Sequence, residues 1–224
     1  MIPVYEDNHI IIVSKESGEI VQGDKTGDTP LSEVVKTYLK DKYKKNGNVF
    51  LGVVHRLDRP VSGLVVFAKT SKALSRLNRM FSEGEIHKTY WAITQKEPEI
   101  SEQTLTNWIV RNEKQNKSYV YDHEVPNSKK AVLRYKVIGH SDRYCLLEVI
   151  LMTGRHHQIR CQLAHIGCPI KGDLKYGAKR SNPGGGIDLL AHQIEFIHPV
   201  SQKTVSVIAP VPESPLWQAI APKR

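Results

Sequence analysis

The chain has 224 residues, of which 40% are hydrophobic, and it carries a formal net charge of +9. This length is enough to bury a sizeable core in one large domain or two small ones, and the positive charge indicates a polyanionic partner such as RNA or DNA. No stretch of about 18 apolar residues occurs, which excludes a membrane-spanning helix. The N-terminus lacks the basic and apolar regions of a secretory signal. We therefore expect a cytoplasmic protein that has no membrane partner.

Cysteine and histidine usage gives no indication of a disulfide framework or a metal site. The three cysteines are an odd number and contain no CxxC pair, so they predict buried thiols in a reducing compartment. They are Cys145, Cys161 and Cys168. His55, His156 and His157 lack partner cysteines and carboxylates at the usual ligand spacings, and we expect no bound metal.

The first half of the chain predicts three strands and two amphipathic helices. Asp28 or Thr29 can cap a helix that has Pro30 in its first turn and that ends before Gly47. Ser71 is placed to cap the second helix. The apolar, β-branched runs that indicate buried strands are residues 10–13, 49–54 and 64–68. The apolar stripes of the two helices comprise Leu31, Val34, Val35, Tyr38 and Leu39, and then Leu74, Leu77, Met80 and Phe81.

The second half predicts more strands than helices. A helix at residues 155–166 is expected to open directly after Thr153-Gly154, so that its N-terminal amides and Arg155 attract an anion. A short helix is expected at residues 214–220. The expected strands are residues 86–95, 105–110, 131–138, 144–152, 189–197 and 204–208. Many strands without regular βαβ alternation indicate an α+β fold with a mainly antiparallel sheet.

One short charged motif carries candidate chemistry. Arg56-Leu57-Asp58-Arg59 lies in the connection between two predicted strands, where a rigid sheet can present a reactive side chain. The two guanidinium groups favour the ionised form of Asp58. A charged carboxylate beside groups that bind phosphate is suited to attack a nucleotide without a metal or an organic cofactor. Taken alone, the motif is equally compatible with a surface salt-bridge cluster.

Further segments decide between these readings. They are residues 5–9 with Lys15 and Gly18, Lys88-Thr89-Tyr90, residues 153–160 (TGRHHQIR), residues 163–173 (LAHIGCPIKGD) and residues 189–199 (LLAHQIEFIHP). Together with residues 55–70 they resemble, in the right order and over essentially the whole chain, the RluA-like family of pseudouridine synthases. Several independent motifs in order are far more specific than any one of them.

The resemblance implies the pseudouridine synthase fold, a long mixed and mainly antiparallel sheet with flanking helices and a central active-site cleft. It also implies one catalytic domain over residues 1–224 without an appended N-terminal RNA-binding domain. The expected activity is isomerisation of uridine to pseudouridine in structured RNA with no cofactor. The target nucleotide must be extruded from the RNA, which costs a few kcal/mol in lost stacking.

The resemblance also assigns residue roles. It makes Asp58 the nucleophile, Tyr90 the ring that stacks on the target base, and Arg160 the partner of the nucleophilic carboxylate. The division of roles between Arg155 and Arg160 stays open, as does the choice of the ribose or the uracil ring as the point of attack. The residues expected to bind RNA are Arg56, Arg59, Arg155 and Lys88.

Two other functions remain compatible with the residues. A non-catalytic RNA chaperone would keep the fold and its biological effect after Asp58→Asn. A glycosidase or nucleosidase would need a second carboxylate across the cleft, for which only Glu148 and Asp173 are candidates. Among RNA substrates, ribosomal RNA is favoured over transfer RNA. We expect a monomer because the chain has no heptad repeat or other oligomerisation signal.

Overall fold

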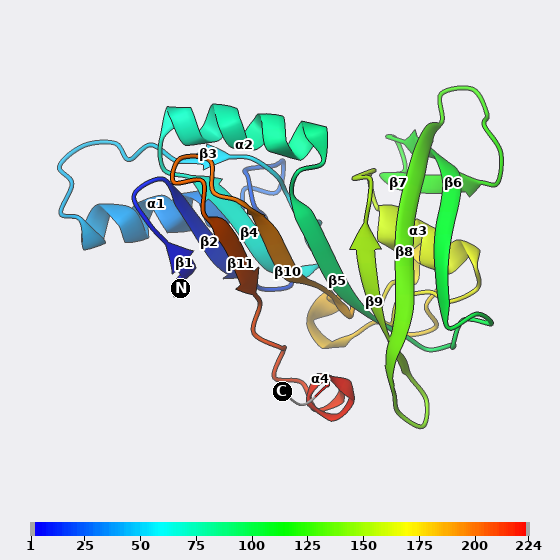
Figure 1. Ribbon diagram of the computed structural model, residues 1–224. Coiled ribbons are helices and arrows are strands. Elements are labelled where there is room, and N and C mark those ends of the chain that lie inside the picture. The colour runs from blue at the N-terminus through cyan, green and yellow to red at the C-terminus, as the bar shows by residue number, and fades with distance from the viewer. Residues whose placement is uncertain (1–2, 223–224) are drawn as a thin grey trace. The chain divides into compact units, whose positions relative to one another are not determined.

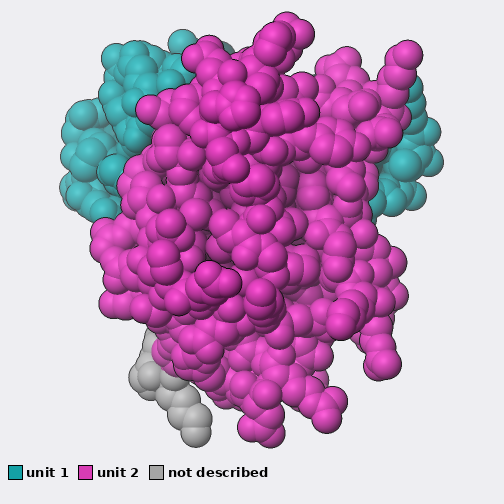
Figure 2. All heavy atoms as spheres, turned by 90° about the vertical axis from the view of Figure 1, so that its right-hand side faces the viewer, with its two compact units in different colours: residues 1–87, 191–210 teal, residues 88–190, 211–224 magenta. Residues whose placement is uncertain are grey.

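The computed structural model describes residues 3–222. The chain forms two compact units, each built from two separate segments (Figure 2). Unit 1 comprises residues 1–87 and 191–210, and unit 2 comprises residues 88–190 and 211–224. The prediction of one catalytic domain over residues 1–224 stays a prediction.

Unit 1 is built around a sheet with two helices (Figure 1). Its strands are β1 (Pro3–Glu6), β2 (Ile10–Lys15), β3 (Gly52–Val53), β4 (Ser62–Ala68), β10 (Leu189–Ile197) and β11 (Thr204–Ile208), and its helices are α1 (Leu31–Lys42) and α2 (Ser71–Glu83). The order is β1-β2-β4-β10, with β3 paired to β4 and β11 paired to β10. Ile10 to Val13 and Val65 to Ala68 are fully buried, as continuous apolar runs predict.

Both helices of unit 1 begin differently from the sequence prediction. Pro30 is the N-cap of α1 and supplies no side-chain cap, so the predicted caps Asp28 and Thr29 are wrong. The carboxylate of Asp28 pairs instead with Arg59. Thr70, one residue before the predicted Ser71, caps α2 by accepting a hydrogen bond from the Ala73 amide at 3.1 Å.

The strand predicted at residues 49–54 is reduced to the two residues of β3. Phe50 is 48% exposed, so this apolar run does not enter the core. Gly52 packs tightly under α2, because a Cβ added to it would meet the Leu74 side chain at 2.7 Å.

Unit 2 is built on a five-stranded antiparallel sheet (Figure 1). In sheet order its strands are β5 (His87–Thr94), β9 (Cys145–Leu151), β8 (Lys129–His140), β6 (Glu102–Asn112) and β7 (Lys117–Tyr121). Its helices are α3 (Gln158–His165) and α4 (Pro215–Ile220), with 3-10 turns η1 (Leu174–Tyr176) and η2 (Pro183–Gly185).

The sheet of unit 2 has one face packed against α3. Along β6 and β8 the buried and exposed side chains alternate with the period of two that a half-buried strand requires. The inner residues Ile109 and Ala131 form a core cluster with Cys161 of α3 and with Tyr176. The short edge strand β7 was not predicted from the sequence.

All three cysteines are free and buried. Burial raises the pKa of the Cys145 thiol to about 11 and that of Cys161 to about 12. Over residues 3–222, no three His, Cys, Asp or Glu side chains gather closely enough to hold a metal ion. In the same part of the chain, no helix has the length and apolar composition needed to cross a membrane.

Candidate active site

Asp58 lies in the connection between β3 and β4 of unit 1, as the sequence predicts. The Val61 amide donates a hydrogen bond to the main-chain oxygen of Asp58 at 3.0 Å, which closes a tight turn. Leu57 is buried and anchors this turn, whereas Arg56 and Arg59 are exposed. Asp58 itself is half-buried.

Lys15 at the end of β2 stabilises the same turn through hydrogen bonds. Its side chain is fully buried. The ammonium group donates to three main-chain oxygens, those of Glu16 (2.9 Å), Arg59 (3.0 Å) and Val61 (2.6 Å). Burial lowers the pKa of Lys15 to about 8, although the charges of Glu19 and Asp58 act in the opposite direction. The sequence marked Lys15 only as part of a motif and gave no signal of this role.

Two further contacts hold the Asp58 loop. The Gly18 amide donates to the Arg59 oxygen at 2.8 Å, which ties the loop after β2 to it. The Val66 amide of β4 donates to Nε2 of His55 at 3.0 Å, and the His55 ring stacks on Phe81 of α2 with a centroid distance of 4.7 Å. The carboxylate is therefore presented on a loop with a restrained backbone.

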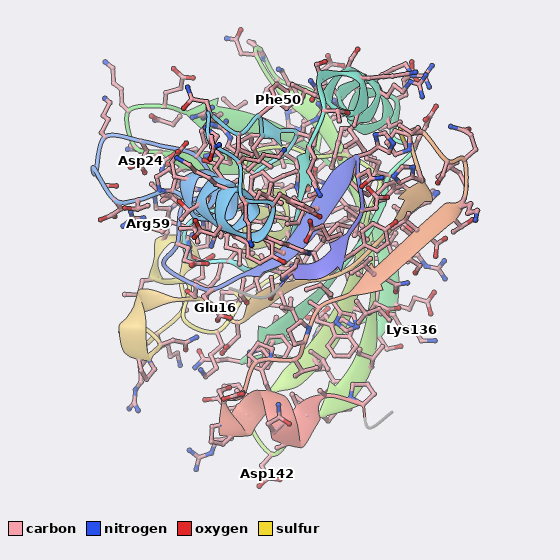
Figure 3. The ribbon with its side chains drawn as sticks, turned by 90° about the vertical axis from the view of Figure 1, so that its left-hand side faces the viewer. Glu16, Asp24, Phe50, Arg59, Lys136 and Asp142 are labelled. Atoms are coloured by element: carbon pink, nitrogen blue, oxygen red, sulfur yellow. The ribbon has the colours of Figure 1, made fainter. Side chains whose placement is uncertain are left out.

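Arg59 is engaged inside unit 1. Its guanidinium group bonds to the carboxylate of Asp28 and to Oγ1 of Thr26, the latter at 3.0 Å. Figure 3 shows Arg59 and Asp24 of the preceding loop on the same side of unit 1. The side chain is still 41% exposed. Arg59 therefore joins the loop before α1 to the loop that carries Asp58.

Tyr90 lies on β5 of unit 2, and its side chain is 8% exposed. It is directly opposite Val149 of β9, which in turn is opposite Tyr135 of β8. Lys88, two residues earlier, has a pKa lowered by burial. A Cβ added to Gly154 would lie 3.8 Å from its ammonium nitrogen, so Lys88 reaches the loop before α3.

Arg160 in the first turn of α3 forms a buried ion pair with Asp173. Nε lies 2.7 Å from Oδ2 and a terminal nitrogen lies 2.8 Å from Oδ1, which is the bidentate geometry that fixes a guanidinium plane. Arg160 is 5% exposed and Asp173 is 1% exposed. From the sequence, Asp173 was a candidate only for the second carboxylate of a glycosidase, and its pairing with Arg160 was not predicted. The predicted pairing of Arg160 with Asp58 stays a prediction.

Arg155 does not start a helix, which corrects the prediction from sequence. α3 begins at Gln158, because His157 has φ 54° and so interrupts helical geometry before it. The side-chain oxygen of Gln158 accepts hydrogen bonds from Oγ1 of Thr153 at 2.8 Å and from the Arg155 amide at 3.0 Å. Arg155 therefore lies in a loop, where its Nε donates to the Lys130 oxygen at 2.9 Å.

A buried network around Tyr176 supports Arg160. The hydroxyl oxygen of Tyr176 accepts from the Ser118 amide at 2.8 Å and bonds to Nδ1 of His157 at 2.7 Å. The guanidinium carbon of Arg160 lies 5.1 Å from the centre of the Tyr176 ring. Burial and the positive charge of Arg160 lower the pKa of His157 to about 2, so its imidazole is neutral.

The predicted site residues divide between the two units. Asp58, Arg56 and Arg59 belong to unit 1, and Tyr90, Arg160, Lys88 and Arg155 belong to unit 2. Unit 1 thus holds a carboxylate on a restrained loop that also carries two arginines, and unit 2 holds an aromatic ring and an oriented guanidinium group.

Comparison with known proteins identifies the family of the chain. Residues 9–165 match the family described as RNA pseudouridylate synthase. The chain is a member of this family. The prediction of a pseudouridine synthase is thereby confirmed, and the protein is an isomerase that converts uridine in RNA to pseudouridine.

Relatives of this RNA pseudouridylate synthase are named for different RNA substrates. "Ribosomal large subunit pseudouridine synthase D" of Xylella fastidiosa is 33% identical over 235 residues, covering 99% of this chain and 69% of that protein. "tRNA pseudouridine synthase C" of Vibrio parahaemolyticus is 29% identical, covering 97% of this chain and 92% of that protein.

A solved structure supports the fold of this synthase. "Human RNA Pseudouridylate Synthase Domain Containing 4" superposes with a TM-score of 0.83 at 20% identity, covering 99% of this chain and 94% of that chain. The predicted fold class, α+β with a mainly antiparallel sheet, is confirmed.

Proposed function

We propose that Asp58 is the nucleophile of this pseudouridine synthase. The observation that carries the proposal is the buried ammonium group of Lys15, which fixes the backbone on both sides of Asp58 through the oxygens of Arg59 and Val61. A reacting group held in one place converts binding into rate acceleration.

In the proposed reaction the carboxylate of Asp58 forms a transient covalent bond to the target nucleotide, at the ribose or at the uracil ring. The bond between ribose C1′ and uracil N1 breaks, the base turns, and C1′ bonds to C5. The proton on C5 is lost and N1 gains a proton, so the product is an isomer of the substrate. No electrons leave the nucleotide, and side chains can perform every step.

We assign Tyr90 and Arg160 to the same reaction. The ring of Tyr90 stacks on the extruded uracil and offsets part of the lost stacking, which is worth roughly 1–3 kcal/mol per base. Arg160 is proposed to hold the carboxylate of Asp58 charged and oriented. The bidentate contact with Asp173 supports this role, because it fixes the plane of the guanidinium group before substrate arrives.

We propose phosphate contacts for Arg56, Arg59, Arg155 and Lys88. The exposure of the three arginines and the net charge of +9 support this assignment. Arg59 would exchange its present partner, the carboxylate of Asp28, for an RNA phosphate.

The proposed substrate is ribosomal RNA. The relative from Xylella fastidiosa, named for the large ribosomal subunit, is 33% identical, against 29% for the transfer RNA enzyme from Vibrio parahaemolyticus. We propose that the protein acts as a monomer in the cytoplasm, where ribosomal RNA is modified, and that it uses no metal or cofactor.

The test is to map pseudouridines in total RNA from cells with and without the gene. Cells that carry Asp58→Asn should lose the same sites as cells without the gene, while Asp142→Asn, in an exposed turn, serves as the matched control. Pseudouridine formation by the Asp58→Asn protein contradicts the proposal. A variant that forms none and still restores the biological effect would indicate an RNA chaperone.

A further inference from the structure

The sheet of unit 2 has one face that is exposed along much of β6 and β8. Side chains of Leu105, Ile109 and Leu133 point to the face packed on α3, and they are buried. Their neighbours along β6 and β8 point to the opposite face, since side chains alternate along a strand. Large apolar side chains on that outer face are exposed, among them Ile150 at 39% and Met152 at 56%.

Three aromatic rings gather at the β7 edge of the outer face. Tyr121 of β7 lies directly opposite Trp108 of β6, and Tyr119 lies directly opposite Val110. Tyr119 and Tyr121 are each 39% exposed, and Trp108 is half-buried. Residues opposite each other in an antiparallel pair share a face. Trp108, Tyr119 and Tyr121 therefore form one surface, the aromatic platform.

Basic side chains surround the aromatic platform. Lys130 of β8 lies directly opposite Trp108 and is exposed, whereas Lys129 lies opposite Ile109 and so points to the face packed on α3. The ammonium nitrogen of Lys117 lies 5.6 Å from the centre of the Tyr119 ring. Within residues 3–222, no carboxylate forms an ion pair with Lys117 or Lys130. This end of the face thus has unbalanced positive charge.

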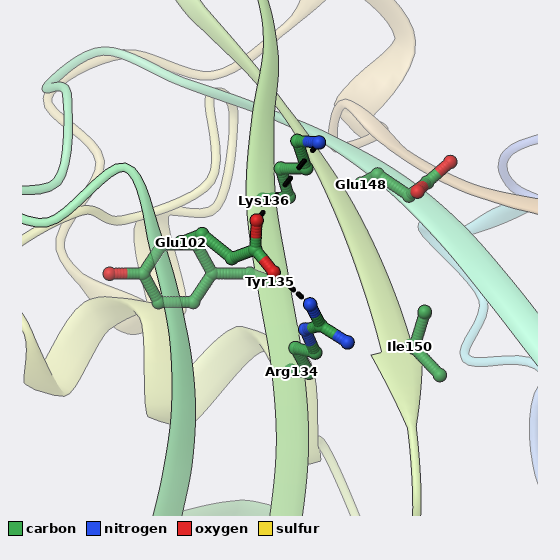
Figure 4. A pocket seen from close by; sticks show the side chains of 6 residues that line it. All are labelled: Glu102, Arg134, Tyr135, Lys136, Glu148 and Ile150. Atoms are coloured by element: carbon green, nitrogen blue, oxygen red, sulfur yellow. Dashed lines mark hydrogen bonds and ion pairs between the residues drawn. The ribbon is translucent and has the colours of Figure 1, made fainter.

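The other end of the same face has a different charge balance. Glu102 forms ion pairs with Arg134 and Lys136, and Glu148 lines the same pocket (Figure 4). Two carboxylates therefore oppose two cations there. Of these two ends of the face, the one around the aromatic platform combines exposed rings with lysines that form no ion pair among residues 3–222.

We propose that the aromatic platform binds a single-stranded segment of the substrate RNA away from the target uridine. This inference rests on the proposed function. Every base has a face that can stack on an aromatic ring, and lysines beside the rings can contact the phosphates. The excess of lysine favours RNA over a protein partner, because lysine is depleted in the cores of protein interfaces.

The aromatic platform is separate from the proposed stacking residue Tyr90. Tyr90, Val149 and Tyr135 are aligned across the sheet of unit 2, and Tyr135 points to the face covered by α3. Trp108 and Lys130 point to the opposite face. The platform therefore engages a part of the RNA that does not react.

Binding is measured by fluorescence anisotropy with a labelled single-stranded RNA of about 12 nucleotides. The double variant Tyr119→Leu/Tyr121→Leu should bind at least about fivefold more weakly because it removes the stacking rings. Tyr119→Phe/Tyr121→Phe keeps the rings and should bind like wild type. Phe50→Leu, which removes an exposed ring from unit 1, is the matched control and should leave the affinity unchanged.

Tryptophan fluorescence gives a direct signal from the aromatic platform. Of the three tryptophans, Trp91 and Trp217 are buried and Trp108 is half-buried. The same RNA without its label should therefore quench Trp108, and the quenching should be absent from Trp108→Phe. Lys117→Gln/Lys130→Gln should reduce the salt dependence of binding by about one to two phosphate contacts.

Turnover separates this inference from the proposed function. With substrate RNA, the leucine variant should raise KM and keep kcat. Unchanged RNA affinity and KM in a variant that still makes pseudouridine overturn the inference, as does a dimer that dissociates in the leucine variant. A wild-type protein that quenches Trp108 with RNA and forms no pseudouridine instead overturns the proposed function.

Discussion

The ammonium nitrogen of Lys15 lies 2.6 Å from the main-chain oxygen of Val61, and this hydrogen bond crosses from the end of β2 to the turn that carries Asp58. Such a contact buries a charge, which lowers the free energy of unfolding, and in return fixes the conformation of the turn. Both effects can be measured.

Lys15→Met should change how stability depends on pH. The pKa of Lys15 is lowered by burial from 10.5 to about 8, so below pH 8 both the folded and unfolded states are protonated. Between pH 8 and 10.5 only the unfolded state keeps the proton, so the free energy of unfolding of the wild-type protein rises by up to about 3 kcal/mol. The Lys15→Met variant lacks this group and should not show the rise. Urea unfolding of both proteins at pH 7.5 and 10 measures this. A difference between them that stays constant with pH contradicts the role of Lys15.

Asp173→Asn should destabilise the protein by about 3–5 kcal/mol because it leaves Arg160 buried without its charge partner. The double variant Arg160→Met/Asp173→Leu should recover most of this stability, since no uncompensated charge remains. It should still form no pseudouridine if Arg160 acts on Asp58. Urea unfolding and a turnover assay on the same preparations separate the two effects, and an active double variant would refute the catalytic assignment.

Gly63→Ala should destabilise unit 1 by about 3 kcal/mol or more. Gly63 has φ +116°, and an added Cβ would come within 2.4 Å of the Ala191 oxygen in β10. Gly47→Ala is the matched control, because nothing lies within 4 Å of its added Cβ. Thermal unfolding compares the two variants, and equal melting temperatures would be inconsistent with the close approach of β4 and β10.

His157→Asn should make the protein less sensitive to acid. The pKa of His157 is lowered to about 2 by burial and by Arg160, so as pH falls below 6.5 only the unfolded state gains a proton. The contribution of His157 to the free energy of unfolding of the wild-type protein is therefore constant above pH 6.5. It should fall by about 2 kcal/mol at pH 5. Asn tolerates the left-handed conformation at this position. Parallel pH profiles of unfolding for the two proteins would contradict the prediction.

Strong periodicity made several elements predictable from the sequence. β10 and β11 have the predicted bounds, residues 189–197 and 204–208, because apolar residues alternate with polar ones along much of both and turn residues flank them. β7 was missed because its run of strand-favouring residues is only five residues long and its alternation of buried and exposed side chains is weak. It exists through its pairing with β6, which the sequence does not display.

The candidate site shows the same limit. Motifs identified Asp58, Tyr90 and Arg160, whereas the partners Lys15 and Asp173 were not assigned. Lys15 reaches its acceptors 44 and 46 residues further along the chain, and such contacts exist only after folding. The start of α3 was misplaced because the left-handed conformation of His157 depends on its contact with Tyr176 and not on local propensity.

Because the buried thiols have raised pKa values, their rate of labelling can report local unfolding of this protein. Thiol reagents react with thiolates, and Cys145 and Cys161 stay protonated and shielded at neutral pH. Alkylation must therefore wait for local or global exposure, and Cys161 in α3 follows the helix that holds Arg160. The rate of Cys161 labelling, with and without RNA, would measure how often α3 opens enough to expose this thiol.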